Sequence, residues 1–361
     1  MTIEVWDSHE LYALQRDDRL DPVPSYFRDT FFKESYFSDD RKIRFSQLPR
    51  ATRVLAPFVL PMEQGKPIYR RKGETLSDFT PPYIKPKDAV RAEDARNVLP
   101  SEVFRNGGVR PSLAQRFDSR VVDITQFHLR AIQMQMAWMA ARAVIDAKIV
   151  IKYERDQGAA DPNVTLDFGR NAGNTVTLGA GLTWDDPDAD ILGNIETWMN
   201  TMYLLNGGGS ASQITCGAAV APLFKKNAGV IKALDTRYRG NQSVQIDMGI
   251  LRTENPINYI GMLGAGLEVY HYRDQVENDD GSLVEILDPR DIVLTCPNTT
   301  GVMAYGAIMD DAALAAGLSS VDIFPKMWRD DDPGATYIMH QSAPLPIPLY
   351  PNRTFKARVL L

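Results

Sequence analysis

The spacing of apolar residues predicts one unusually long helix in the middle of the chain. Between residues 112 and 147, apolar side chains recur every three or four positions, as on one face of a helix. Ser112 follows Pro111 and is a suitable N-cap. At about 1.5 Å per residue, this helix would be roughly 54 Å long. The predicted apolar face consists of Leu113, Phe117, Val121, Ile124, Phe127, Ala131, Met134 and Trp138.

Shorter apolar runs after this helix predict alternating strands and helices. We expect strands within 148–154, 164–169, 175–178, 213–216, 259–272 and 291–297. A further helix is expected from Asp188 or Asp190 to about Leu205, since aspartates suit the positive end of a helix dipole. Another helix is expected within 221–238. These elements predict an α+β fold with mixed antiparallel sheets.

Before the long helix, two segments have apolar residues without an obvious core. Segment 27–37 could form a short amphipathic helix, with Phe27, Phe31 and Phe32 at helical spacing. It would dock either on the chain's own core or on a neighbouring subunit. Segment 49–111 holds nine of the 23 prolines, so extended chain is expected there. Phe79, Tyr83 and Ile84 make this ribbon too apolar for an ordinary linker, which favours a partner surface.

The charge balance argues against general nucleic-acid binding. The formal net charge is −6 and the pI is about 5.4. A local basic stretch nevertheless lies in the proline-rich segment, with acidic residues between its members: Arg70, Arg71, Lys72, Lys85, Lys87 and Arg91. It could be a solvated face. We favour electrostatic pairing with an acidic surface of an adjacent copy, which would fix orientation more than it adds affinity.

Motifs that carry chemistry are largely missing from the sequence. Two distant cysteines, Cys216 and Cys296, argue against a disulfide scaffold or a zinc site. None of the four histidines has a catalytic or ligand neighbour at useful spacing. The aspartates of 185–190 lack the glycine and glutamate of a calcium loop and are interpreted as helix capping. No enzyme activity, cofactor or metal is expected.

Several separated stretches resemble one known family, in the order in which that family has them. They are RRKGETLSDFTPPYIKPK (70–87), LDTRYRG (234–240), YGAIMDD (305–311), FPKMW (324–328) and YIMHQSAPL (337–345). Together they resemble the lambda-like major capsid protein E family of tailed phages. The resemblance implies the Hong Kong 97-type fold, with the order of parts that this fold has. These parts would be an N-terminal arm (1–57), an extended loop (58–107), a peripheral domain with the long helix as its spine (108–184), an axial domain (185–329) and a return to the peripheral domain (330–361).

The resemblance also implies a role and a set of partners. Such proteins form hexamers and pentamers of an icosahedral shell around double-stranded DNA, within a virion assembled in the host cytoplasm. The expected partners are further copies of the chain, a separate scaffold protein, a portal and a decoration protein, with no membrane and no sequence-specific DNA contact. Candidate contacts between subunits are Phe31, Phe32, Arg70, Arg71, Lys72, Phe79, Tyr83, Ile84, Lys85, Lys87, Arg237 and Arg239.

Three alternatives were weighed against this interpretation. A cellular nanocompartment shell would share the fold. An α+β enzyme with a dimerisation arm would need a catalytic constellation, which the sequence does not supply. A nucleic-acid-binding module using Arg70–Lys72 conflicts with the acidic net charge and the interleaved carboxylates.

Overall fold

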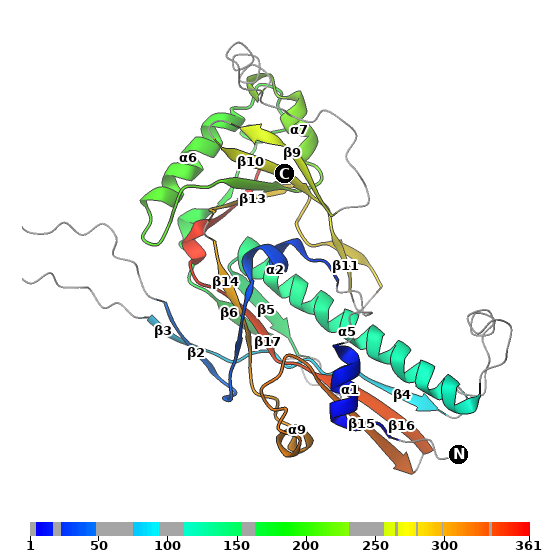
Figure 1. The fold of residues 1–361 in the computed structure, drawn as a ribbon. Coiled ribbons are helices and arrows are strands. Elements are labelled where there is room, and N and C mark those ends of the chain that lie inside the picture. Colours follow the sequence, from blue (N-terminus) through cyan, green and yellow to red (C-terminus); the bar gives the residue numbers. More distant parts are fainter. Residues whose placement is uncertain are drawn as a thin grey trace, which may run out of the picture.

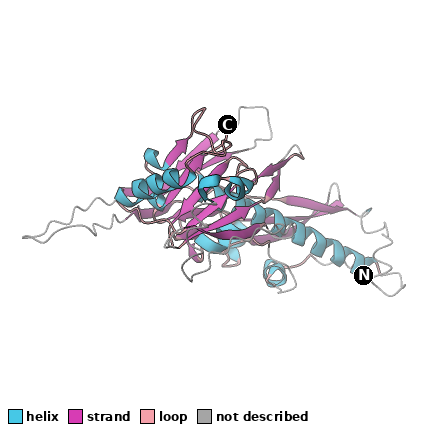
Figure 2. Ribbon diagram, turned by 90° about the horizontal axis from the view of Figure 1, so that it is seen from above, coloured by secondary structure: helices cyan, strands magenta, loops and turns pink. Residues whose placement is uncertain are grey.

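The structure is a computed structural model that describes residues 5–16, 23–47, 75–91, 93, 112–153, 163–230, 256–263, 266–278, 281–297, 299–331 and 334–361. Helix α5 runs obliquely through the molecule, with a six-stranded sheet and its helices above one end (Figure 1). Seen from above, the described elements form an elongated body along this helix (Figure 2).

Helix α5 (Leu113–Ile145) confirms the predicted long helix and its start. Its N-terminus is a capping box, in which Ser112 and Gln115 each accept a hydrogen bond from the other's backbone N–H. The helix ends at Asp146, and Ala147 then takes a positive φ of 51° before β5 begins. The 33 residues form a continuous axis along which the other elements pack.

The apolar face predicted for α5 is only partly correct. Phe117 and Val121 are buried, but Leu113, Phe127 and Ala131 are exposed. The buried face instead passes through His128, a polar residue that a hydrophobic pattern omits. Towards its C-terminus the helix is enclosed on more than one side, so periodicity no longer marks a single face. Its other buried side chains include Thr125, Leu129, Ile132, Met136, Met139, Ala140 and Val144.

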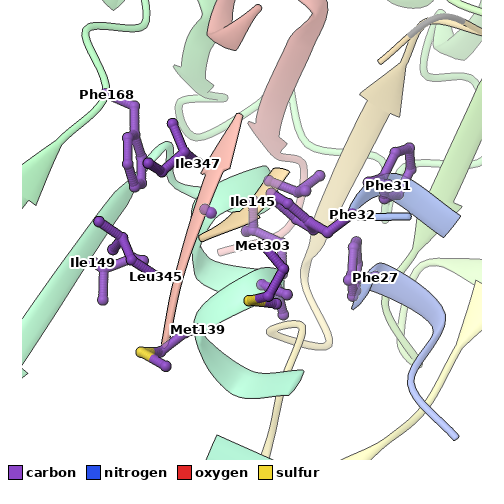
Figure 3. Packing of buried hydrophobic residues seen from close by; sticks show 14 of the residues in the cluster. Phe27, Phe31, Phe32, Met139, Ile145, Ile149, Phe168, Met303, Leu345 and Ile347 are labelled. Atoms are coloured by element: carbon purple, nitrogen blue, oxygen red, sulfur yellow. The ribbon is translucent and has the colours of Figure 1, made fainter. Parts of the chain in front are cut away.

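The largest core surrounds the C-terminal half of α5 (Figure 3). On one side lies the three-stranded sheet of β1 (Glu34–Phe37), β14 (Gly301–Tyr305) and β17 (Pro344–Pro348), in the order β1-β14-β17. The hairpin of β5 (Lys148–Lys152) and β6 (Asn163–Asp167) and the short helix α2 (Tyr26–Phe31) complete it. Met139 and Ile145 of α5 belong to this core together with Met303 of β14 and Leu345 and Ile347 of β17.

A second core lies in the six-stranded sheet, whose order is β7-β18-β13-β8-β10-β9. Helices α6 (Ile191–Leu204) and α7 (Ala221–Lys226) contribute to this core, and Asp190 caps α6 as predicted. Trp184 stacks on Trp198, which stacks on Phe355. The strands are β7 (Thr175–Thr177), β8 (Gln213–Cys216), β9 (Ile257–Leu263), β10 (Leu267–Tyr272), β13 (Asp291–Thr295) and β18 (Thr354–Arg358).

A third sheet packs against the N-terminal half of α5, in the order β15-β16-β4. Its strands are β4 (Lys87–Arg91), β15 (Phe324–Asp331) and β16 (Gly334–Gln341), and helix α1 (Ser8–Gln15) lies against β15. Separately, β2 (Ile43–Gln47) and β3 (Thr75–Phe79) pair antiparallel. The remaining elements are β11 (Gln275–Glu277), β12 (Leu283–Glu285), α9 (Asp311–Ala315), η1 (Ala172–Asn174) and η2 (Pro351–Arg353).

Two expectations about element bounds need correction. Segment 27–37 is not one helix: α2 ends at Phe31, and Glu34–Phe37 is strand β1, parallel to β14. The helix expected within 221–238 is interrupted: α7 ends at Lys226, because Asn227 is extended and its side-chain amide donates to the carbonyls of Pro187 and Ala189. Residues 228–230 are helical again, and residues 231–238 lie outside the described residues.

Strand pairing also cuts across the domain boundaries expected at the C-terminus. Strand β15 lies within the expected axial range but pairs with β16, next to α5. Strand β18 lies within the expected peripheral return but pairs with β13 and β7 in the six-stranded sheet. Sequence order alone could not reveal the position of β18, because its partners β13 and β7 lie far from it in the chain, whereas β15 and β16 are neighbouring segments of one hairpin.

Candidate assembly surface

The proline-rich ribbon is tied to its own chain over residues 75–91. Strand β3 pairs with β2, and strand β4 pairs with β16. Between them, Ile84 forms a two-way backbone bridge with Ser342, with N···O distances of 2.9 and 3.1 Å. The expectation that this ribbon lacks a core of its own is therefore wrong for the described residues.

The side chains of the ribbon also contact residues of the same chain. Phe79 is buried in the largest core and lies 5.5 Å from Phe168, centroid to centroid. The Tyr83 hydroxyl donates to Gln341 Oε1 at 2.9 Å and accepts from Met309 N at 3.1 Å. Burial raises the pKa of Tyr83, which keeps this hydroxyl a donor.

The two described lysines of the ribbon lie over aromatic rings of the same chain. Lys85 Nζ lies 4.6 Å from the centroid of the Tyr83 ring. Lys87 Nζ lies 4.1 Å from the Tyr337 ring and 5.1 Å from the Trp328 ring. Both lysines are exposed, so each contact adds about 0.5–1 kcal/mol and still leaves the ammonium group accessible.

The N-terminal aromatic candidates are buried. Phe31 and Phe32 are 4% and 5% exposed and belong to the largest core. Phe27 packs edge-on against Tyr272, 5.0 Å away, in the same region. These positions favour docking of α2 on the chain's own core over docking on a neighbour, the other alternative left open by the sequence.

Five candidate contacts lie outside the described residues. They are Arg70, Arg71, Lys72, Arg237 and Arg239. The first three belong to the segment between β2 and β3, whose two strands form a paired stem at its base.

Exposed apolar side chains mark surfaces that sequence reasoning missed. Tyr36 and Phe37 are 53% and 45% exposed on β1, an edge strand of its sheet. Tyr259 and Met262 are likewise exposed on β9, the edge of the six-stranded sheet. Exposed edges carrying large apolar groups are the features that pair with another chain. The aromatic content of 34–37 could have indicated this exposed strand, but the sequence analysis included these residues in the expected helix.

A chain of ion pairs joins the C-terminal end of α5 to the six-stranded sheet. Asp146 accepts from Lys356 at 2.8 Å, and Lys356 lies 3.0 Å from Asp291. Asp291 is fully buried and also binds Arg358 at 2.8 Å. Burial alone would raise the pKa of Asp146, but Lys356 and Arg142 outweigh it and hold this pKa below its usual range. The two cores are thus connected by charge as well as by packing.

The described residues provide little for catalysis. Among them, no three or more His, Cys, Asp or Glu side chains are grouped to hold a metal ion. Burial raises the pKa of the Cys216 thiol, and that of Cys296 to about 11, so neither is a reactive thiolate. Within the described part of the chain, no helix is long and apolar enough to cross a membrane.

Comparison with known proteins decides the family. The model of the phage major capsid protein E family matches residues 15–359. The chain belongs to this family. It is 31% identical to the major capsid protein of Escherichia phage lambda over 93% of both chains. It is 30% identical to that of Enterobacteria phage phi80, over 95% of this chain and 96% of the relative.

Solved structures agree on the fold of this phage major capsid protein E family member. A proposed capsid protein of a prophage in Escherichia coli CFT073 superposes with a TM-score of 0.68 at 19% identity, over 99% of each chain. The fold is the Hong Kong 97-type capsid fold, as the sequence resemblance implied. Helix α5 is accordingly the spine helix, and the lambda-like interpretation is preferred to the nanocompartment and enzyme alternatives.

Proposed function

We propose that the chain is the building block of an icosahedral phage head, assembling as hexamers and pentamers around double-stranded DNA. The observation that carries this proposal is the family match over residues 15–359, at nearly the full length of the lambda protein. The role is structural, without catalysis. Assembly takes place in the host cytoplasm, with a separate scaffold protein, a portal and a decoration protein as further partners.

The basic segment and the exposed edge strands favour assembly through more than one kind of contact between subunits. Segment 48–74 connects the paired strands β2 and β3 in the sequence and includes Arg70, Arg71 and Lys72, which would pair with acidic groups of an adjacent copy. The exposed edge strands β1 and β9 offer apolar contacts. Obligate interfaces bury on the order of 2,000 Å² or more. A segment of this length, together with the flatter contacts of the edge strands, can supply that area.

The acidic net charge suits a wall that encloses DNA without binding it tightly. At −6 per chain, the average electrostatic interaction with phosphates is repulsive. DNA could then enter and leave without a large penalty. A strongly basic inner wall in an assembled shell would contradict this part of the proposal.

The first experiment measures assembly directly. The full chain is expressed alone and with a candidate scaffold, sized by light scattering and imaged by negative stain. Rings, shells or tubes are expected. A discrete dimer under every condition, together with a co-purifying ligand, would instead indicate an enzyme.

The second experiment tests the basic segment. Reversing charge at Arg70, Arg71 and Lys72 together should reduce shell yield while the far-UV circular dichroism stays unchanged. A matched control reverses three exposed cations elsewhere, Arg130, Lys152 and Lys226, and gives the same change in net charge. Normal assembly of the first triple variant, or equal loss in both, would remove the specific role assigned to this segment.

A further inference from the structure

Three side chains from three elements meet where β4 crosses the spine helix. His128 of α5 places Nδ1 2.9 Å from Nδ1 of His340 on β16, and its Nε2 3.0 Å from Oδ2 of Asp88 on β4. The two histidines are 1% and 0% exposed, whereas half of the Asp88 side chain is exposed. At these distances both contacts are hydrogen bonds, so each needs one donor and one acceptor.

The chemistry of the three groups fixes where the protons lie at neutral pH. The Asp88 carboxylate can only accept, so His128 Nε2 carries a proton and donates it. A neutral His128 then has a bare Nδ1, which accepts from the Nδ1–H of His340. His340 Nε2 is consequently bare. It is buried, and no hydrogen-bond partner reaches it among the described residues.

An additional proton has no favourable position in this arrangement. On His128 Nδ1 it would face the N–H of His340 at hydrogen-bond distance. On His340 Nε2 it would create a buried N–H without an acceptor. Burial therefore lowers the pKa of His340 to about 3, helped by His128. Burial also lowers the pKa of His128, and Asp88 only partly offsets this.

Other charged groups on the packed elements either contact other residues or are exposed. On β4, Lys87 lies over Tyr337 and Trp328, and Arg91 is exposed. On β15, Lys326 binds Asp310 at 3.0 Å. On α5, Arg120 lies near Asp123 and Arg130 is exposed. On α1, His9 and Glu10 are exposed. Asp88 is the charged group that acts on His128, and His128 the one that acts on His340.

We propose that Asp88, His128 and His340 form an acid-sensitive hydrogen-bonded cluster. It holds β4 and β16 on the spine helix at neutral pH and releases them as the pH falls. Strand β4 also contacts β16 through its backbone ladder, and His340 N donates to Pro86 O at 3.2 Å. Weakening the contact between the two histidines would thus release the ribbon where it joins the β15-β16-β4 sheet.

The direction of the effect follows from proton linkage. A histidine released into water has a pKa of about 6.5, whereas both histidines have lower values in the closed fold. Their stabilising contribution is present above about pH 6.5 and is lost as the pH falls below it. For each histidine that is neutral in the closed fold and protonated in the open one, the ratio of open to closed molecules rises about tenfold for each pH unit below this value.

Hydrogen exchange of the β4 amides in the full-length chain tests this proposal. Between pH 6.5 and 5.5, after correction for intrinsic exchange rates, the open population should rise about tenfold or more. The double variant His128→Gln/His340→Asn removes both titrating groups and keeps amide hydrogen-bonding capacity. It should reduce the rise to less than twofold. His9→Gln, at an exposed histidine on α1, should keep the full response.

Two results would overturn the proposal: a full acid response in the double variant, or no response in the unaltered chain. Asp88→Asn provides a second test that does not disturb the buried pair, because its exposed amide oxygen can still accept from His128. Without the carboxylate, a proton on closed His128 is less favourable. Opening at pH 5 should then exceed that of the unaltered chain several-fold, and an equal or smaller response would also contradict the proposal.

Discussion

At the scale of single residues, contacts between residues distant in the chain could not be predicted from the sequence. His128 and His340 are separated by 212 positions, and no local spacing connects them. The aromatic side chains of the ribbon and the N-terminal segment were recognised as anchors, but their partners were not. Phe31, Phe32 and Phe79 were candidates for contact with a neighbour, and the sequence left docking of Phe31 and Phe32 on the chain's own core open, because burial depends on tertiary contacts that one sequence does not encode locally.

Gly301 illustrates such a contact and gives a prediction. A Cβ at this position would overlap the ring of Phe32 and lie 2.9 Å from Ile347 O. Gly301→Ala should therefore displace Phe32 and lower the free energy of unfolding by roughly 1–3 kcal/mol. Urea denaturation of the unassembled chain measures this. Gly179→Ala is the matched control, because nothing lies within 4 Å of its Cβ position. Equal stability of the two variants would show that the ring moves freely.

At the scale of elements, the sequence predicted the spine helix well and its surroundings less well. Its start and length followed from the Ser112 cap and the sustained apolar repeat. Its buried face was misjudged at His128 because a polar residue can be buried when its hydrogen bonds are satisfied within the protein. The ion pair between Asp146 and Lys356 beyond its C-terminus joins residues 210 positions apart, so it too required the structure.

The ion-pair chain predicts unequal effects for two similar substitutions. Lys356→Met leaves the fully buried Asp291 with one cation fewer and should lower the free energy of unfolding by about 3 kcal/mol or more. Arg290→Met removes an exposed cation beside Asp288 and should lower the free energy of unfolding far less, because exposed ion pairs contribute little. Chemical denaturation of both variants makes the comparison. Similar losses in the two variants would mean that Lys356 contributes little beyond surface charge.

At the scale of the whole molecule, strand β13 belongs to both large cores. Val293 faces the core around α5, whereas Ile292 and Leu294 face the core of the six-stranded sheet. This arrangement follows from the alternation of side chains along a strand. The hydrophobic contacts of the two large cores are therefore continuous through one shared strand, and the division into peripheral and axial domains stays a prediction.

A shared strand predicts a single cooperative unfolding transition. Val293→Ala and Leu294→Ala alter adjacent residues on opposite faces, and each should destabilise the chain by about 2–4 kcal/mol. In differential scanning calorimetry of the unassembled chain, both should lower the temperature of the same transition. Two resolved transitions, each affected by only one of the variants, would show that the cores unfold independently.

The position of β18 has a consequence for synthesis. This strand, residues 354–358, lies between β7 and β13 inside the six-stranded sheet. The sheet therefore stays incomplete, with the β13 edge uncovered, until residues 354–358 have been translated and have left the ribosome. During synthesis, the strands on either side of β18 are thus present before the strand that joins them.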